Sequence, residues 1–178
     1  MKLAEAYTRA LREFDDRVHK VAPEQWTAPT PCTEWSVRDL VNHLTGEHLW
    51  APWLLRGATL DEVGDRAAGD VLGDDPVRAW ERAAAGSREA FETPGALDGR
   101  VHVTGGRIAA SDYAWQMISD LTVHAWDLAR GIGADDRLDP DLAQEIYDRT
   151  APQADRWQSL GIFGPPVDVP QDAPVQDR

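Results

Sequence analysis

Asp120 and His124 stand four residues apart in the segment SDYAWQMISDLTVHAWDLARG, whose apolar residues follow a helical period. In a helix, two residues at this spacing lie on the same face, and their side chains meet. A carboxylate oxygen and an imidazole nitrogen held in this way can supply two ligands to a divalent metal ion. The same pair can also form an ordinary hydrogen bond, so the spacing alone does not decide between a metal site and a local contact.

A third ligand could come from an earlier helical segment that contains two histidines. His43 lies at the edge of the apolar stripe of this segment, on the side shared with Glu47, whereas His48 lies nearer the middle of the stripe. A histidine on or beside an apolar face is more often a packed core residue than a ligand. Periodicity slightly favours His48 and leaves the choice between the two open.

Further polar residues near these positions have two interpretations each. Asp127 either orients His124 from behind or forms a surface ion pair with Arg130. Glu47 and His48 either line the mouth of a pocket or serve packing and solvation, and the second role is favoured for both.

Two more candidates lie outside the predicted helices. His102 and Arg107 flank a Gly-Gly turn and could hold an anionic substrate, although a solvated loop is the favoured interpretation. Cys32 is rejected as a nucleophile, because no neighbouring feature of the sequence activates its thiol.

Apolar residues at three- and four-residue steps predict five helices to position these side chains, over residues 3–21, 36–57, 75–91, 111–131 and 139–160. Ser36 followed by an acid three residues later predicts a capped helix start. Asp-Pro pairs predict the starts of the third and fifth helices. Residues 57–75 are expected to form a long connection that contains a short helix. Residues 101–106 are expected to form a hairpin or an extended loop, and the proline-rich tail from residue 161 is expected to be extended.

Long helices with one extended crossover predict an all-α fold. We expect an up-down four-helix bundle with an additional C-terminal helix and an extended tail, which forms a single domain over residues 1–178. The eight tryptophans spread along the chain and are expected to fill gaps between helices.

The bulk properties narrow the range of partners. A net charge of −13 disfavours nucleic acids and anionic membrane surfaces, and no apolar run is long enough to cross a bilayer. The single cysteine cannot form an internal disulfide and is compatible with a reducing cytoplasm. We therefore expect a cytoplasmic protein that acts on a small molecule, with a homodimer left open.

Three stretches of the sequence resemble a known family. The stretches PTPCTEWSVRDLVNHLTGEHLW, ISDLTVHAWDLARGIG and FGPPVDVPQDAPVQDR resemble an actinobacterial family related to the metal-binding N-terminal domain of mycothiol-dependent maleylpyruvate isomerase, within the DinB-like superfamily. The resemblance implies a divalent metal held by His43, Asp120 and His124. The related isomerase has a glutamate where Asp120 stands, so the shorter side chain implies an ion closer to its helix or reached through water.

The resemblance also implies a chemistry. Two histidines and one carboxylate leave open positions on a metal, with zinc as the first choice and nickel, iron or manganese compatible with the same donors. Mycothiol is the implied co-substrate, and thiol transfer or isomerisation the implied reaction. A non-catalytic metal- or ligand-binding protein and an enzyme that uses the bundle cavity without a thiol are the alternatives.

The isomerase carries a further C-terminal domain that helps to build its active site, so we do not expect the maleylpyruvate reaction itself. Since the family continues past the residue that corresponds to Arg178, we expect the chain to be a truncated form.

Overall fold

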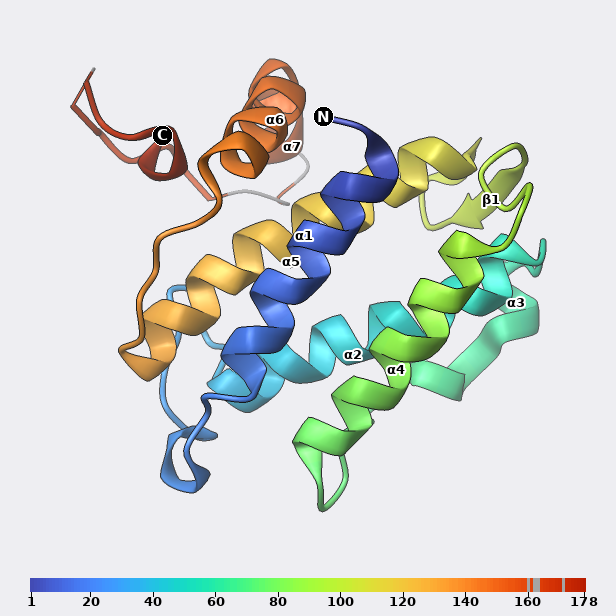
Figure 1. Cartoon of the computed structure of the whole chain (residues 1–178), viewed down its shortest axis with the longest axis horizontal. Helices are drawn as coiled ribbons and strands as arrows, with labels where there is room; N and C mark the ends of the chain where they lie inside the picture. Colours follow the sequence, from blue (N-terminus) through green and yellow to red (C-terminus); the bar gives the residue numbers. More distant parts are fainter. Residues whose placement is uncertain (160, 162–163, 171) are drawn as a thin grey trace.

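Four long helices form the body of the protein, as the sequence predicts (Figure 1). The computed structural model describes residues 1–159, 161, 164–170 and 172–178. The four helices of the bundle are α1 (Leu3–Val18), α2 (Val37–Leu55), α4 (Pro76–Glu92) and α5 (Ala110–Ile132). A short α3 (Leu60–Val63) follows α2, and α6 (Pro140–Thr150) and α7 (Ala154–Ser159) follow α5. The predicted all-α bundle is therefore confirmed.

Helices α2, α4 and α6 begin at the predicted caps. The Ser36 hydroxyl accepts a hydrogen bond from the Asp39 backbone N–H, and the Asp39 carboxylate accepts one from the Ser36 N–H at 2.9 Å. Asp75 and Asp139 cap α4 and α6, each with a proline in the first helical turn. These side chains satisfy N–H groups that have no partner within the helix.

The connection between α2 and α4 determines the direction in which α4 runs. It returns to the beginning of α2, where Arg38 donates to Asp70 and the Asn42 amide donates to the Gly69 carbonyl. Helix α4 therefore starts at the same end as α2, and the two helices run in the same direction (Figure 1). The predicted up-down alternation holds between α1 and α2 and between α4 and α5, whereas the long crossover removes it between α2 and α4.

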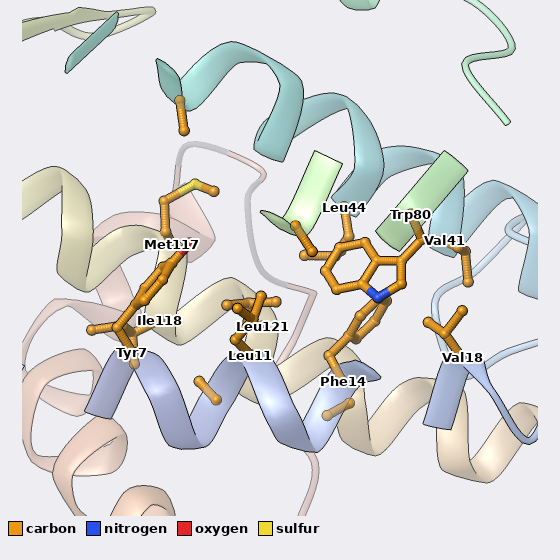
Figure 2. Close-up of a cluster of buried hydrophobic side chains, with 14 of the residues drawn as sticks. Tyr7, Leu11, Phe14, Val18, Val41, Leu44, Trp80, Met117, Ile118 and Leu121 are labelled. Atoms are coloured by element: carbon orange, nitrogen blue, oxygen red, sulfur yellow. The ribbon is translucent and has the colours of Figure 1, made fainter. Parts of the chain in front are cut away.

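The core lies between the four long helices (Figure 2). The rings of Phe14 on α1 and Trp80 on α4 meet edge to face with centroids 4.8 Å apart. Leu11, Leu44 and Leu121 bring aliphatic side chains from α1, α2 and α5 into the same cluster. This shared burial of apolar surface fixes the rotation of each helix, and with it the direction in which the polar side chains on α2 and α5 point.

A β-hairpin closes the end of the bundle at which α5 begins. Strands β1 (Arg100–Val103) and β2 (Gly106–Ala109) are antiparallel, and Val103 pairs with Gly106 across the turn. Gly106 has a φ of +110°, which only glycine adopts without strain. Of the two predicted alternatives for this segment, the hairpin is the one observed.

The predicted fifth helix is interrupted. It ends at Thr150, continues as a 3₁₀ turn over Ala151–Gln153 and resumes as α7. Pro152 has no N–H, and its ring clashes with the carbonyl four residues earlier in a regular helix, which accounts for the break here. The predicted end at Leu160 lies outside the described residues. The first helix ends at Val18, three residues before the predicted Val21.

The described part of the tail, residues 164–170 and 172–178, is non-helical apart from a short 3₁₀ turn over Val175–Asp177, in agreement with the prediction. No helix in the described part of the chain combines the length and the apolar character that crossing a bilayer requires.

Candidate metal centre

The structure brings His43, Asp120 and His124 together between α2 and α5. Nε2 of His43 lies 3.2 Å from one Asp120 oxygen, and Nε2 of His124 lies 3.3 Å from the other. The two imidazole rings are 5.4 Å apart and nearly perpendicular. The indole of Trp35 covers both, with its ring 5.0 Å from His43 and 5.9 Å from His124. The three residues named by the resemblance therefore form one cluster, which we call the triad.

The spacing within the triad fits a metal ion. Two ligand atoms that each lie about 2.0–2.1 Å from a tetrahedral ion are about 3.3–3.4 Å apart. The two nitrogen–oxygen separations of the triad are close to this value, and its three ligand atoms all lie within 4.8 Å of one another. The triad side chains are 14% to 31% exposed, so an ion between them could bind a further small ligand.

Asp127 orients His124 from the side opposite the triad. Its carboxylate accepts a hydrogen bond from Nδ1 of His124 at 2.9 Å, which leaves Nε2 as the nitrogen that faces Asp120. Arg130 pairs with Asp136 instead, at 3.1 Å. Of the two interpretations of Asp127, the orienting role is the one that the geometry supports.

Cys32 lies beside this pair, although the sequence offered no reason to place it there. Its Sγ is 3.3 Å from the Asp127 carboxylate, to which the thiol donates, and 3.7 Å from Nδ1 of His124. Cys32, His124 and Asp127 thus form a second group of residues with metal-ligand chemistry. Since Nδ1 of His124 is engaged with Asp127, this group forms a hydrogen-bonded support behind the triad.

Gly131 allows the loop that carries Cys32 and Trp35 to approach α5. A Cβ at this position would lie 3.1 Å from methyl groups of both Thr30 and Val37. A contact this close would push the loop away from the helix. The feature of the sequence that could have revealed the position of Cys32 is therefore a glycine within a helix, which often marks a close approach.

Charge within the triad shifts the pKa values of its members in opposite directions. Burial alone would raise the pKa of Asp120, but hydrogen bonds to His124 and His43 hold it below its usual range. Burial alone would lower the pKa of His124, but hydrogen bonds to Asp120 and Asp127 raise it to about 11. Burial and the Asp120 charge raise the pKa of Glu47, one helical turn from His43. Without an ion, the triad is therefore a hydrogen-bonded cluster in which the Asp120 carboxylate is ionised and both ring nitrogens of His124 carry a proton.

His48 does not belong to the triad. It is fully buried, with its ring 5.1 Å from that of Trp80 and 6.5 Å from that of Tyr7. Burial lowers the pKa of His48 to about 3, so its ring is neutral at physiological pH. The choice between His43 and His48, which periodicity leaves open, is made by the packing of α2.

A cavity of about 450 Å³ lies next to the triad. Glu47 and Gln116 line it, and each is one helical turn from a triad residue on its own helix. The hairpin contributes Val103 and Ile108, and α7 contributes Arg156. Of the two interpretations of Glu47, the structure therefore shows the one at a pocket, which the sequence had disfavoured.

His102 and Arg107 face away from this cavity. They pair across the hairpin and line a separate hollow of about 210 Å³ with Arg100 and Thr59. Alternate residues of a strand point to opposite faces, so Val103 and Ile108 face the triad side and this pair does not. The structure does not bring His102 or Arg107 to the candidate metal centre.

The sequence of the chain matches a known domain family over residues 7–129, described as the mycothiol maleylpyruvate isomerase N-terminal domain. The chain belongs to this family. The matched range contains the triad, Cys32 and Asp127, whereas α6 and α7 lie beyond it.

Two further comparisons extend this assignment. The chain is 31% identical to uncharacterized proteins from two strains of Mycobacterium tuberculosis, CDC 1551 / Oshkosh and H37Rv. Each match extends over 144 residues, which cover 79% of the chain and 72% of the relative. Crystal structures of mycothiol-dependent maleylpyruvate isomerase and of a mutant of it have TM-scores of 0.67 and 0.69. They are 17% and 16% identical to the chain, and the match covers 92% of the chain and 74% of each isomerase chain. This similarity confirms the fold.

Proposed function

We propose that this protein is a divalent-metal-dependent enzyme of thiol-transfer or isomerase type, which holds its ion between His43, Asp120 and His124. The observation that carries the proposal is the geometry of the triad, whose nitrogen and oxygen atoms have the separations of metal ligands. The hydrogen bond from His124 to Asp127 supports it, because a ligating histidine commonly donates its second ring N–H to a carboxylate.

A set of three protein ligands leaves positions open on the ion, as in catalytic rather than structural sites. An ion bound there would lower the pKa of a water or thiol on it and so provide a nucleophile at neutral pH. Zinc is the first choice for two imidazoles and a carboxylate, and nickel, iron and manganese accept the same donors. The family description and the name of the structurally similar isomerase include mycothiol, which makes this thiol the first co-substrate to test.

The side chains around the triad have separate tasks in this proposal. Asp127 fixes the orientation of His124, and the Cys32 thiol donates to the same carboxylate. Trp35 covers the two imidazole rings and limits the access of water from its side. The cavity at Glu47 and Gln116 is the route by which a small molecule would reach the ion.

Metal analysis tests the common premise. Protein purified without chelator is analysed for bound metals, and zinc affinity is then measured by calorimetry for wild type, His43→Ala and His124→Ala. Structural zinc sites with four ligands bind with about 10–16 kcal/mol, so the loss of one ligand is expected to reduce affinity by roughly 10² to 10³-fold. His19→Ala is the matched control, because this exposed histidine directly after α1 pairs with Glu81, away from the triad.

Cys32→Ser identifies which of the two groups of residues holds the ion. A serine hydroxyl still donates to Asp127, so zinc affinity is expected to stay within about tenfold of wild type. The proposal is wrong if wild-type protein remains sub-stoichiometric in metal under every loading condition. An ion bound by the group behind the triad would show the opposite pattern, with Cys32→Ser impaired and His43→Ala unaffected.

Mass spectrometry of thiol adducts tests the reaction type. The metal-loaded protein is incubated with mycothiol and a panel of electrophilic acceptors, and adducts are compared with those formed by metal-free protein and by His124→Ala. We expect metal-dependent acceleration with at least one acceptor. A fully loaded protein that accelerates no adduct formation and no isomerisation in the panel would contradict the enzymatic assignment while leaving the metal site intact.

A further inference from the structure

We propose that the cavity beside the triad binds an aromatic monocarboxylate, with the ring against its apolar walls and the carboxylate on Arg156. This inference rests on the proposed function in one respect, since it names the class of substrate for that site. Arg156 lies beyond the range of the family match.

The walls of the cavity favour a flat apolar ligand. Its volume of about 450 Å³ lies within the range of small-molecule sites. Six of the thirteen residues that line it have apolar or indole side chains: Trp50, Leu54, Leu60, Val103, Ile108 and Trp157. An aromatic ring would replace water along these walls and gain both apolar burial and ring–ring contact.

Two buried polar groups on the cavity wall favour a ligand that offers oxygen atoms. Among the described residues, neither the Tyr113 hydroxyl nor the Trp50 indole N–H has a hydrogen-bond partner, although both atoms are buried. Tyr113 is only 3% exposed. An indole N–H can only donate, and leaving such a group unpaired is unfavourable. A carbonyl, hydroxyl or carboxylate oxygen of a ligand that reached either group from the cavity would satisfy it.

The charges of the cavity favour one carboxylate rather than two. Among the described residues that line it, Arg156 is the cation and Glu47 is the acid. The guanidinium group matches a carboxylate in shape and donates two parallel hydrogen bonds. A second carboxylate on the ligand would come close to Glu47, and like charges at short range repel. The end of the cavity at Glu47 and Gln116 is next to the triad, so the reacting group of the ligand belongs there.

Ligand binding is measured on the full chain, with metal removed by chelation and again after zinc loading. The probes are 2-naphthoate, its neutral analogue 2-naphthamide, and succinate, which has charge without a ring. We expect saturable binding of 2-naphthoate by calorimetry in both forms of the protein. Binding of 2-naphthamide and of succinate is expected to be weaker by at least about tenfold.

Variants assign the binding to individual groups. Arg156→Gln is expected to reduce the preference for the acid over the amide to less than about threefold, because the charge-assisted pair is lost. Tyr113→Phe is expected to weaken 2-naphthoate binding by about fivefold through the loss of one hydrogen bond. Arg149→Gln is the matched control, since this arginine on α6 lies over the Trp115 ring and pairs with Glu145 outside the cavity.

Equal affinity of wild type for 2-naphthoate and 2-naphthamide would overturn the proposal, as would an unchanged preference in Arg156→Gln. The absence of saturable 2-naphthoate binding to protein with a helical circular dichroism spectrum would overturn it as well. The two proposals fail separately. Acid binding without zinc binding contradicts only the metal site, and zinc binding without acid binding contradicts only the assignment of the cavity.

Discussion

Tyr7 and Tyr113 allow the value of one buried hydrogen bond to be measured within a single aromatic cluster. Both rings are 3% exposed and both contact Phe91, with centroid distances of 4.7 Å and 5.8 Å. The Tyr7 hydroxyl shares a hydrogen bond of 2.9 Å with the hydroxyl of Ser87, which is fully buried on α4. The Tyr113 hydroxyl has no such partner among the described residues. Replacement by phenylalanine therefore removes a hydrogen bond at one position and only a hydroxyl at the other.

The expected magnitudes follow from these surroundings. Tyr7→Phe leaves the Ser87 hydroxyl buried without its partner, which costs about 1–2 kcal/mol of unfolding free energy. The double variant Tyr7→Phe/Ser87→Ala replaces both polar groups by apolar ones and is expected to recover about 1 kcal/mol of that loss. Tyr113→Phe removes a hydroxyl that makes no hydrogen bond, so we expect a change of less than about 0.5 kcal/mol or a small gain in stability.

Urea unfolding followed by far-ultraviolet circular dichroism measures these differences, with a chelator present so that bound metal does not contribute. With a slope of about 2 kcal/mol per molar urea, Tyr7→Phe should lower the midpoint by roughly 0.5–1 M. The slopes must agree among the variants, because a changed slope indicates a changed folded or unfolded state rather than a changed stability.

A Tyr113→Phe variant that loses as much stability as Tyr7→Phe would refute this reasoning. It would show that the Tyr113 hydroxyl has a partner in the folded protein, and it would remove one of the arguments for a ligand in the cavity. A Tyr7→Phe variant as stable as wild type would show that Ser87 finds another acceptor, such as a carbonyl of its own helix.

Three further measurements test the site and the core. Hydrogen bonds to Asp120 and Asp127 raise the pKa of His124 to about 11, so zinc binding at pH 7 should release about one proton, and zinc affinity should fall about tenfold for each pH unit below neutrality. Calorimetry in two buffers of different ionisation enthalpy measures the number of protons released. Release of no proton would contradict this expectation. Burial lowers the pKa of His48 from 6.5 to about 3, so between these two pH values the unfolded chain binds a proton at His48 that the folded protein does not. The free energy of unfolding therefore falls as the pH falls through this range, by up to about 1.4 kcal/mol per pH unit. His48→Met should reduce that slope in urea unfolding at pH 4–6, and an unchanged slope would exclude His48 as its source. Gly131→Ala should destabilise the protein relative to Gly86→Ala. An added Cβ at Gly86 meets open space, so that variant should gain about 0.5–1 kcal/mol of unfolding free energy. Equal stability of the two variants would show that the loop at residues 29–37 moves without cost.

The helices could be predicted because their signals are local. Ser36 caps α2 through its own side chain and that of Asp39, and a proline follows each of the acids that cap α4 and α6. These contacts form within one turn and need no partner from elsewhere in the chain. The break at Pro152 is also a local signal, and the single helix predicted over residues 139–160 overlooked it.

The direction of α4 could not be predicted in the same way. It depends on the path of residues 56–75, which turn back along α2 through contacts of Arg38 and Asn42. Nothing in the periodicity of either helix specifies whether a long connection crosses the bundle or returns, because both paths bury the same apolar faces.

Within the candidate site, the sequence by itself determined the pairing of Asp120 with His124, since four residues of helix place the two side chains on one face. The third member was decided only by the tertiary structure. His43 and His48 are both on α2, and the packing of that helix turned His43 toward Asp120 and His48 into the core beside Trp80. Cys32 lies beside His124 because its loop packs closely against α5 at Gly131, where a side chain would leave no room. Such contacts join residues far apart in the chain, so they arise only once the apolar faces of the helices have packed against one another.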